Sequence, residues 1–372
     1  MARESAPPPI PLPPAAWRRP FRQRLLRWYA KHARDLPWRR SRDPYRVWIS
    51  EIMLQQTQVA TVKSYFERFV RAFPTVQALA RAEERRVLRL WEGLGYYRRA
   101  RQMHEAARAI VQRHGGRFPT DSESVRALPG VGRYTAGAIL SIALDAREPI
   151  LEANTIRLFC RLLAYDGPPH AKEGQAVLWA MAEWILPRHN VGRFNQALME
   201  LGSEVCRNRS PGCASCPVEV LCEARRRGLQ TQLPRPKPKP LMEDRHEAAV
   251  LVRRRGRVLL VQCPEGGRWA GLWDFPRFEM TAEHESGRRD ELVRRVHETT
   301  GLVIALGRRL TTLHHGVTRF RITLDCYEAS CTAGRLRNRE DQAMRWVAPD
   351  ELAEYPLSTT GRTLSRLVGA RD

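Results

Sequence analysis

Four cysteines near the middle of the chain have the spacing of metal-cluster ligands. They are Cys206, Cys213, Cys216 and Cys222, in the order C-x6-C-x2-C-x5-C, and proline and glycine residues bend the backbone between them. Thiolates gathered over so few residues can surround one tetrahedral or cubane metal centre. We interpret the array as the ligands of a [4Fe-4S] cluster. A structural zinc site and disulfides are the alternatives, and the spacing alone does not choose between iron and zinc.

A second motif, Leu-Pro-Gly-Val-Gly at residues 128–132, separates two stretches that we expect to be helical. This arrangement predicts a helix-hairpin-helix. Two glycines one residue apart let backbone N–H groups approach an anion closely, and the dipole of the following helix favours negative charge. We therefore expect Gly130, Val131 and Gly132 to contact one DNA phosphate. An ordinary turn between two helices is the alternative.

The composition is that of a basic globular protein. The chain has 372 residues, 43% of them hydrophobic, which is enough for two domains with their own cores. It has no apolar run of about 18 residues, and its N-terminus is Pro-rich, so we expect a cytoplasmic protein, nucleoid-associated if bacterial. The formal net charge of +23 indicates a polyanionic partner, nucleic acid first of all. Arginine spread along the whole chain also fits a bias in genomic base composition.

Hydrophobic periodicity predicts an all-α domain followed by an α+β domain. Residues 1–16 are Pro-rich and are expected to be disordered. Apolar residues recur at spacings of three and four over residues 17–227, which is typical of helices. The run LPRPKPKP within residues 228–244 predicts an extended, semi-rigid linker. Residues 245–372 then change to a mixed period and form the second domain.

Short patterns place elements in this second domain. Two apolar runs, 248–252 and 258–261, flank Arg-Arg-Arg-Gly-Arg and predict a β-hairpin. Residues 290–299 have a helical period, and residues 320–326 alternate as a strand does. The domain is therefore expected to be a small α+β unit.

Several motifs occur together and in order, and they point to a family. They are SEIMLQQTQV at 50–59, WEGLGYYRRAR at 91–101, LPGVGRYTAGAI at 128–139, FNQALMELGSEVC at 194–206, and the cysteine array. With them the chain resembles the MutY-type adenine DNA glycosylases. The resemblance implies a helix-hairpin-helix glycosylase domain with a [4Fe-4S] cluster, and a Nudix-like domain that helps to recognise 8-oxoguanine. It also implies removal of adenine mispaired with 8-oxoguanine or guanine in double-stranded DNA, within base excision repair.

The reaction needs an acid to protonate the leaving base and a carboxylate to stabilise an oxocarbenium-like sugar. By resemblance, Glu51 is the acid. Its neighbours in the sequence are apolar: Ile49, Ile52, Met53 and Leu54. A carboxyl group buried among such residues holds its proton near neutral pH. The alternative is an exposed glutamate on a helix.

The second carboxylate departs from the family pattern. The family typically has Asp-Gly-Asn, whereas this chain has Glu152-Ala153-Asn154. A glutamate reaches about 1.5 Å further, so it must fold back, or the backbone must retreat, to place its charge near C1′ of the sugar. We expect Glu152 to stabilise the cation and Asn154 to position the sugar-phosphate or the water. Slow catalysis or an altered substrate is the alternative.

Tyr134 distinguishes two related mechanisms. In the endonuclease III relatives the corresponding position carries a lysine that forms a Schiff base, and a phenol cannot form that adduct. We therefore expect a monofunctional glycosylase that leaves an abasic site, with Tyr134 hydrogen-bonded near the active-site carboxylate. A tyrosine packed against the hairpin would lead to the same conclusion.

Extruding a base leaves a gap in the stack that the enzyme must fill. By resemblance, Gln55 and Gln56 contact the lesion or the vacated space, and Tyr96 is the aromatic residue that wedges beside 8-oxoguanine. Arg39, within LPWRR at 36–40, is either a base or phosphate contact or a solvated arginine.

The C-terminal domain also departs from its family pattern. A working Nudix hydrolase holds Mg²⁺ with R-E-x-x-E-E-x-G, and residues 294–301 read RRVHETTG, so only Glu298 of the acids remains. We therefore expect binding rather than nucleotide hydrolysis. The lesion-sensing loop of the family usually reads Phe-Ser-His, and this chain has Val317-Thr318-Arg319. Thr318 keeps the hydroxyl, and Arg319 is expected to donate to the lesion or to a phosphate.

Two other functions fit the same motifs. One is a related glycosylase with altered base specificity, which Glu152 and Ala153 would permit. The other is a non-catalytic, cluster-containing DNA-binding protein. We expect a monomer without a membrane partner, in contact with other repair or replication proteins.

Overall fold

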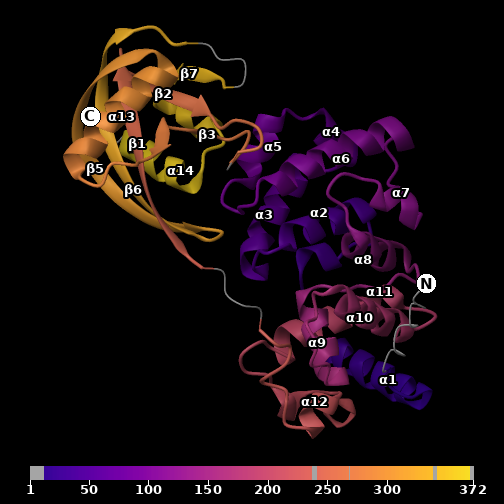
Figure 1. The fold of residues 1–372 in the computed structure, drawn as a ribbon. Helices are drawn as coiled ribbons and strands as arrows, with labels where there is room; N and C mark the ends of the chain where they lie inside the picture. Colours follow the sequence, from indigo (N-terminus) through magenta and orange to yellow (C-terminus); the bar gives the residue numbers. More distant parts are fainter. Residues whose placement is uncertain (1–11, 237–240, 268, 338–341, 369–372) are drawn as a thin grey trace, which may run out of the picture. The chain divides into compact units, whose positions relative to one another are not determined.

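The computed structural model of this chain describes four stretches of the sequence: residues 12–236, 241–267, 269–337 and 342–368. Figure 1 shows helices in the earlier part of the chain and a sheet with helices in the later part, which confirms the predicted fold class. Most of the N-terminus predicted to be disordered, and the end of the Pro-rich run, lie outside the described residues. Among the described residues, no helix is both long and apolar enough to cross a membrane.

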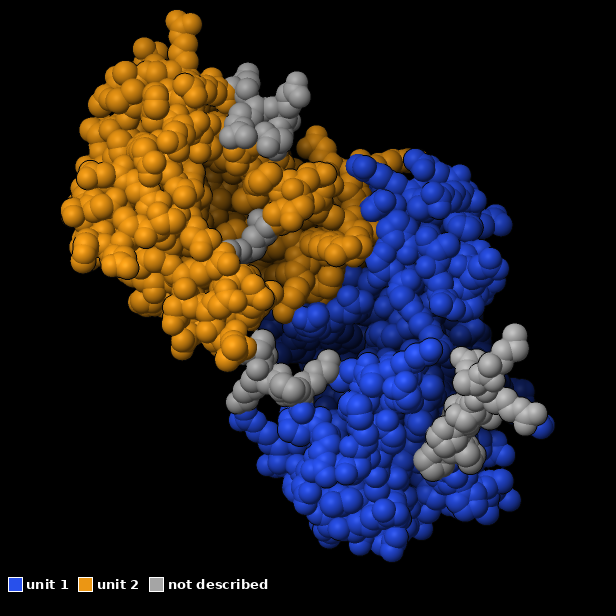
Figure 2. All heavy atoms as spheres, in the orientation of Figure 1, with its two compact units in different colours: residues 1–80, 105–238 blue, residues 81–104, 239–372 orange. Residues whose placement is uncertain are grey.

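The chain forms two compact units, which Figure 2 colours separately. Unit 1 consists of residues 1–80 and 105–238, and unit 2 consists of residues 81–104 and 239–372. A piece of the helical sequence, residues 81–104, therefore belongs to the same unit as the sheet. Periodicity does not reveal this, because it reports that a helix face is covered and not what covers it. The domain boundaries at residues 227 and 244 stay a prediction.

Unit 1 is built from helices joined by short turns. Its elements are α1 (Ala15–His32), η1 (Pro37–Arg39), α2 (Pro44–Leu54), α3 (Val59–Ala72), α4 (Val76–Arg81), most of α6 (Arg98–His114), α7 (Ser122–Arg126), α8 (Arg133–Leu144), α9 (Ala153–Leu163), α10 (Lys172–Trp184), α11 (Val191–Glu200), η2 (Leu201–Val205), η3 (Cys213–Ser215), η4 (Glu219–Leu221) and α12 (Glu223–Arg226). Apolar side chains of α1, α9, α10 and α11 share one core, in which Phe21, Leu158, Met181 and Phe194 are almost completely buried. Helix α1 begins two residues before the predicted start at Trp17.

Local sequence determines where α2 begins. Asp43 caps the helix, because its carboxylate accepts a hydrogen bond from the backbone N–H of Tyr45 at 3.0 Å. Pro44 occupies the first helical position, where no N–H is needed. The helix is buried over most of its length, from Val47 to Met53. It therefore carries Glu51 into the interior of unit 1.

The predicted helix-hairpin-helix is present between α7 and α8. Asp121 caps α7 by accepting a hydrogen bond from the N–H of Ser124 at 2.8 Å, and Gly132 directly precedes α8. Gly130 has a φ of 74°, in the left-handed region that side chains rarely adopt. The tight turn thus requires glycine at this position.

The described part of unit 2 contains a seven-stranded sheet with helices on both faces. Its elements are α5 (Glu84–Trp91), β1 (Glu243–Arg254), β2 (Arg257–Gln262), β3 (Trp273–Asp274), β4 (Arg277–Glu279), α13 (Glu285–Thr300), β5 (Leu302–Val317), β6 (Phe320–Gly334), β7 (Met344–Val347), η5 (Asp350–Glu354) and α14 (Thr359–Val368). The main path of the sheet is β3-β2-β1-β6-β5, with β4 paired to β1 and β7 paired to β2. Strands β1 and β6 run parallel, and the other pairs of neighbouring strands are antiparallel.

Alternation along β1 explains why both faces of the sheet are covered. Successive strand residues point to opposite faces. Ala249 and Leu251 lie in the core that includes α14, whereas Val250 and Val252 lie in the core that includes α13. The predicted hairpin is confirmed, because β1 and β2 pair antiparallel across the arginine-rich turn.

Candidate active site

A pocket of about 550 Å³ in unit 1 collects most of the residues that the sequence predicts for catalysis. Its lining comes mainly from residues 34–39, α2, the helix-hairpin-helix, the start of α9 and the end of α11. The predicted residues among the lining are Glu51, Gln55, Gln56, Gly130, Gly132, Tyr134, Glu152 and Asn154. Val131, predicted together with the two glycines, is buried between them. Motifs far apart in the sequence thus meet at one cavity.

Glu51 is a buried carboxylic acid. Only 5% of the residue is exposed. Burial raises the pKa of Glu51 from 4.5 to about 7, a hydrogen bond from Tyr134 opposes the rise, and the charge of Glu152 adds to it. A large fraction of Glu51 therefore carries a proton at neutral pH, as an acid catalyst requires. The alternative of an exposed helix glutamate is wrong.

Tyr134 is the hydrogen-bond partner of Glu51. Its hydroxyl donates to Oε2 of Glu51 over 2.6 Å and lies 3.5 Å from the sulfur of Met199. Tyr134 is in the first turn of α8, so the hairpin that precedes this helix also places the phenol. Burial, together with the charge of Glu51, raises the pKa of Tyr134 well above its usual range. Tyr134 is therefore a neutral donor at physiological pH.

Glu152 folds back onto the helix that follows it. As the N-cap of α9, it accepts at Oε1 from the N–H of Thr155 at 2.9 Å, and at Oε2 from the backbone and side-chain N–H groups of Asn154 at 2.8 and 3.1 Å. The hydroxyl of Thr155 accepts from the N–H of Glu152 at 2.8 Å, which completes a capping box. Burial raises the pKa of Glu152, although the donors from Asn154 and Thr155 favour the ionised form.

This capping geometry accommodates the departure from the family pattern. Of the two arrangements considered from the sequence, the side chain of Glu152 folds back and the backbone stays at the start of the helix. Ala153 is the exposed first residue of α9, where alanine is readily accepted. Both residues therefore fit a regularly capped helix start.

A run of hydrogen bonds connects Glu152 to the first cysteine of the array. The side-chain oxygen of Asn154 accepts from Arg157 at 2.8 Å, and Nε of Arg157 donates to the carbonyl of Cys206 at 2.8 Å. Gly202 permits this close packing, since a Cβ added there would stand 2.8 Å from the Cβ of Asn154. Hydrogen bonds through Asn154 and Arg157 therefore join the carboxylate of Glu152 to the backbone of Cys206.

The four cysteines of the array line one small pocket beside η3, η4 and the start of α12. Arg161, which is 1% exposed, donates to the sulfur of Cys206 at 3.2 Å and to the carbonyl of Arg207 at 2.7 Å. Its Nε donates to the carbonyl of Leu233 at 2.9 Å. Arg161 therefore ties the array to the first residue of the Pro-rich run.

The donor set has the chemistry that a group held by four thiolates requires. All eight cysteines lie in the described part of the chain, and none of them forms a disulfide there. Burial raises the pKa of Cys216 to about 12 and that of Cys222 to about 11, so ionised sulfurs here need a cation beside them. Among the described residues, no three His, Cys, Asp or Glu side chains have the arrangement of a metal site.

Sequence reasoning missed a charged cluster at the edge of the active-site pocket. Glu200, completely buried at the end of α11, accepts hydrogen bonds at 2.8 Å from the guanidinium groups of Arg34 and Arg39. Burial would raise the pKa of Glu200, but the two arginines outweigh it and lower the pKa to about 2. The side chain of Arg39 is 15% exposed, so the alternative of a solvated arginine is wrong. The only signal in the sequence was a glutamate on the apolar stretch FNQALMEL.

The two glutamines after Glu51 differ in their surroundings. The side-chain N–H of Gln55 donates to the hydroxyl of Thr135 at 3.3 Å, which helps to hold α2 against α8. Gln56 is exposed and has a φ of 57°, an uncommon conformation for a residue with a side chain. Gln56 is therefore the more accessible of the two to a DNA strand.

Unit 2 has a groove of about 770 Å³ whose lining includes Tyr96 and Thr318. Tyr96 is 56% exposed with a φ of 49°, and Thr318 has a φ of 54°. Left-handed backbone at residues other than glycine concentrates at functional sites. The structure therefore brings together two residues, from distant segments, that the family resemblance assigns to lesion recognition.

Arg319, the third residue assigned to lesion recognition, is not among the residues that line this groove. Its Nε lies 3.0 Å from a carboxylate oxygen of Glu243, and its guanidinium carbon lies 5.1 Å from the ring centre of Phe320. Arg319 is therefore engaged with the start of β1, whereas Thr318 lines the groove.

Comparison with known proteins gives the family. Residues 49–183 match the model of the HhH-GPD superfamily base excision DNA repair proteins, and residues 248–366 match the NUDIX domain. The adenine DNA glycosylase of Rattus norvegicus is 33% identical over 399 residues, which cover 93% of this chain and 77% of the rat protein. That of Homo sapiens is 34% identical, with 93% and 73% covered. The chain belongs to the MutY-type adenine DNA glycosylases.

A MutY-type protein is a DNA N-glycosylase of base excision repair, and this chain is such an enzyme. Among solved structures, a thermostable thymine-DNA glycosylase matches with a TM-score of 0.52 and 28% identity. That match covers 57% of this chain and 98% of the thymine-DNA glycosylase. It agrees with the helical architecture of unit 1.

Proposed function

We propose that this MutY-type enzyme removes adenine mispaired with 8-oxoguanine or guanine, by hydrolysing the N-glycosidic bond without cutting the strand. The observation that carries the proposal is the buried pair in the unit 1 pocket. Glu51 has a pKa of about 7 and is bonded to Tyr134, where a Schiff-base enzyme would need a lysine. Similarity to adenine DNA glycosylases supports adenine as the base that is removed.

Glu51 supplies the proton. The bond between C1′ and the base breaks with its electron pair going to adenine, and a proton from Glu51 to a ring nitrogen neutralises the leaving group. A pKa of about 7 leaves the acid both partly protonated and acidic enough to donate at neutral pH. The hydroxyl of Tyr134 bonds to Oε2 of Glu51, which leaves Oε1 to face the base.

Glu152 stabilises the sugar. Loss of the base leaves positive charge on C1′ and the ring oxygen, and an ionised carboxylate close by lowers the energy of that state. Glu152 accepts three hydrogen bonds from N–H groups, and among the described residues Glu51 accepts one from Tyr134. This difference assigns the ionised role to Glu152. Water then adds its oxygen to C1′ and gives a proton to a carboxylate, which leaves free adenine and an abasic sugar.

The groove in unit 2 reads the base opposite adenine. Tyr96 offers an exposed ring on which a base can stack, and Thr318 offers a hydroxyl. 8-Oxoguanine has an N–H at ring position 7, where guanine has an acceptor. A hydroxyl or carbonyl oxygen of the Thr318 turn therefore distinguishes the two bases.

The four cysteines hold a [4Fe-4S] cluster in this proposal. Such a cluster would give the loop of residues 206–222 a rigid anchor, and its basic neighbours would then face phosphates in a fixed arrangement. Arg161 would donate a hydrogen bond to the sulfur of Cys206. Iron and zinc analysis of the purified protein, with its visible absorption spectrum, distinguishes the cluster from zinc.

The deciding experiment is single-turnover release of adenine from duplexes in which adenine faces 8-oxoguanine or guanine, with and without alkali. We expect release from both duplexes and strand cleavage only after alkali. Glu51→Gln should slow release about 10³-fold, because the acid is lost while the shape is kept. Glu173→Gln, at an exposed glutamate of the same unit, is the matched control and should keep the wild-type rate.

Three results would contradict the proposal. Strand cleavage without alkali would indicate a lyase. Release of thymine from a thymine–guanine mismatch, but not of adenine, would indicate altered base specificity, which the Glu152-Ala153 departure makes worth testing. Tight binding of the 8-oxoguanine duplex with no release at all would indicate a non-catalytic binding protein.

A further inference from the structure

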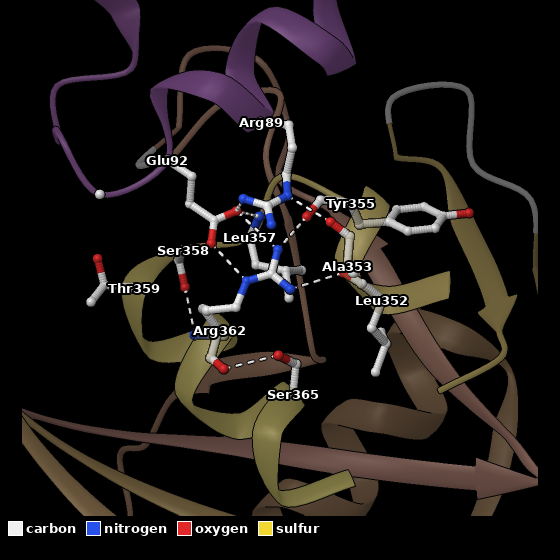
Figure 3. A network of polar contacts seen from close by, with 12 residues as sticks. Arg89, Glu92, Leu352, Ala353, Tyr355, Leu357, Ser358, Thr359, Arg362 and Ser365 are labelled. Carbon is white, nitrogen blue, oxygen red and sulfur yellow. Dashed lines mark hydrogen bonds and ion pairs between the residues drawn. The ribbon is translucent and has the colours of Figure 1, made fainter. Parts of the chain in front are cut away.

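A buried glutamate is one of the residues that join residues 81–104 to the rest of unit 2. Glu92 directly follows α5, and its carboxylate forms a two-pronged ion pair with Arg362 of α14, at 2.6 and 2.9 Å (Figure 3). The backbone N–H of Leu357 donates to the same carboxylate at 3.2 Å. The side chain of Glu92 is 9% exposed and that of Arg362 is 17% exposed, so water competes little for this pair.

Arg362 also organises the chain that precedes α14. Its Nη1 donates to the carbonyl of Leu352 at 2.9 Å, and its Nη2 donates to that of Tyr355 at 2.7 Å. Arg89 of α5 donates to the carbonyl of Ala353 at 2.6 Å. Figure 3 shows these donors and acceptors converging between α5 and the segment before α14. Charge-assisted bonds of this kind are stronger than neutral ones.

The Glu92 contact lies at the base of the turn that carries Tyr96. The turn is held internally, because the indole N–H of Trp91 and the guanidinium of Arg99 both donate to the carbonyl of Gly95, each at 3.1 Å. The bond from Trp91 joins the turn to the last residue of α5. Glu92, together with Arg89, joins the turn and α5 to the segment before α14.

Leu357, which donates to Glu92, lies close in sequence to two further residues that line the groove. Leu357 is followed by Ser358, which is buried and donates to Asp274 at 2.8 Å. Thr359 and Thr360 come next, and both line the groove together with Tyr96. The carboxylate of Glu92 thus joins the segment before Tyr96 to the segment before these threonines.

We propose that Glu92 and Arg362 are positioning residues for recognition of the base opposite the target adenine. Neither is among the residues that line the groove. The pair holds the Tyr96 turn against residues 357–360, so that Tyr96 and Thr318 present one preformed surface to DNA. A preformed surface binds more tightly because no ordering cost is subtracted from the binding free energy. The inference rests on the proposed function, which assigns this groove to 8-oxoguanine.

The test compares wild type, Glu92→Ala, Tyr96→Ala and the double variant. Each is titrated, at one salt concentration, with duplexes that carry a non-hydrolysable adenine nucleotide opposite 8-oxoguanine or guanine. We expect Glu92→Ala to reduce the preference for the 8-oxoguanine duplex about tenfold. The double variant should match Tyr96→Ala, because Glu92 acts through Tyr96. Glu83→Ala, at an exposed residue directly before the same helix, should keep the preference within about twofold.

The rate of adenine release separates positioning from general damage. At saturating enzyme, Glu92→Ala should release adenine opposite 8-oxoguanine within about threefold of the wild-type rate, because the unit 1 pocket is unchanged. An equal loss of affinity for both duplexes would overturn the proposal. The proposal would also be overturned if the loss of preference in the double variant equalled the product of the losses in Glu92→Ala and Tyr96→Ala. The preference is a ratio, so an unfolded fraction does not alter it.

Amide hydrogen exchange at Leu357 tests the contact without any substrate. Exchange should accelerate in Glu92→Ala and stay unchanged in Glu83→Ala, because the carboxylate of Glu92 accepts the Leu357 hydrogen bond. Unchanged exchange in Glu92→Ala would overturn the proposal. A wild-type enzyme that does not prefer the 8-oxoguanine duplex would refute the part of the proposed function that assigns the groove to 8-oxoguanine, and the exchange result would still decide the Glu92 contact.

Discussion

The Glu51 pocket of unit 1 and the Tyr96 groove of unit 2 are built in different ways. In the pocket the central carboxyl group is 5% exposed, and burial raises its pKa to about 7. In the groove Tyr96 is 56% exposed, and the hydroxyl of Thr318 bonds to the carbonyl of Val317 at 2.7 Å. The pocket controls a protonation state, whereas the groove presents a surface. Substitutions should therefore change the rate in the pocket and the discrimination between bases in the groove.

After the loss of the acid Glu51, the largest effect is expected from the charge of Glu152. Glu152→Ala should slow adenine release about 100-fold, because the carboxylate that stabilises the sugar cation is lost. Glu152→Asp keeps a charge and a good N-cap, so its rate should stay within about tenfold of wild type. Single-turnover release at saturating enzyme from the adenine–8-oxoguanine duplex measures both rates.

The capping role of Glu152 needs its own control. Glu152→Ala should also lower the stability by about 1 kcal/mol, because α9 loses its N-cap. Asparagine is a good N-cap without charge, so Glu152→Asn should keep the stability and lose the rate. If Glu152→Asn released adenine as fast as wild type, the charge of Glu152 would have no part in the reaction.

A smaller effect concerns the pH dependence that Tyr134 sets. The rate should fall as pH rises through about 7, because Glu51 must be protonated to act. The hydrogen bond from Tyr134 lowers the pKa of Glu51, so removing it in Tyr134→Phe should raise that pKa. The fall of the rate at high pH should then occur about one pH unit higher. Single-turnover rates between pH 5.5 and 9 would show the shift.

The direction of the shift is the decisive feature. If the rate of Tyr134→Phe fell at a lower pH than that of wild type, Tyr134 would favour the protonated form of Glu51. The hydrogen bond that Tyr134 donates to Glu51 predicts the opposite. Glu51→Gln provides the reference, because its residual rate should lack this fall altogether. If Glu51→Gln and wild type had the same pH dependence of the rate, the protonation of Glu51 would not control the reaction.

The parts of the pocket that the sequence predicted share one property. Glu51 and Tyr134 lie in contiguous motifs whose helices begin at local signals, Asp43 for α2 and the glycine turn for α8. The apolar neighbours of Glu51 in the sequence predicted its burial, and burial raises the pKa of Glu51. The helix-hairpin-helix and the β1–β2 hairpin were predictable for the same reason, because short-range turn chemistry determines them.

The rest depends on contacts between distant segments. Glu200 and Arg39, or Glu92 and Arg362, are ordinary surface charges when the sequence is read alone, and only the fold shows that each pair is largely buried. The same limit applies to residues 81–104, whose partner cannot be deduced from a helical period. The fold-back of Glu152 was one of two arrangements open from the sequence, and the donors of its own helix decide between them.

The smallest effect is expected in the groove, at Thr318. Thr318→Ala removes one hydroxyl, so the preference for adenine opposite 8-oxoguanine over adenine opposite guanine should fall about fivefold, the value of one hydrogen bond. Thr318→Ser keeps the hydroxyl and lacks the branched Cβ, which is strained at a φ of 54°, so it should retain the preference. The ratio of affinities for the two duplexes measures the effect.

Arg319 gives the comparison for this last prediction. The guanidinium of Arg319 is engaged by Glu243, and Arg319 does not line the groove. Arg319→Ala should therefore lower the affinity for both duplexes alike and change the ratio of the two affinities by no more than about twofold. A larger loss of preference in Arg319→Ala than in Thr318→Ala would mean that Arg319 leaves Glu243 when DNA binds. DNA binding would then bring Arg319 into the groove. In the pocket, by contrast, the hydrogen bonds of Glu51 and Glu152 are already formed without DNA.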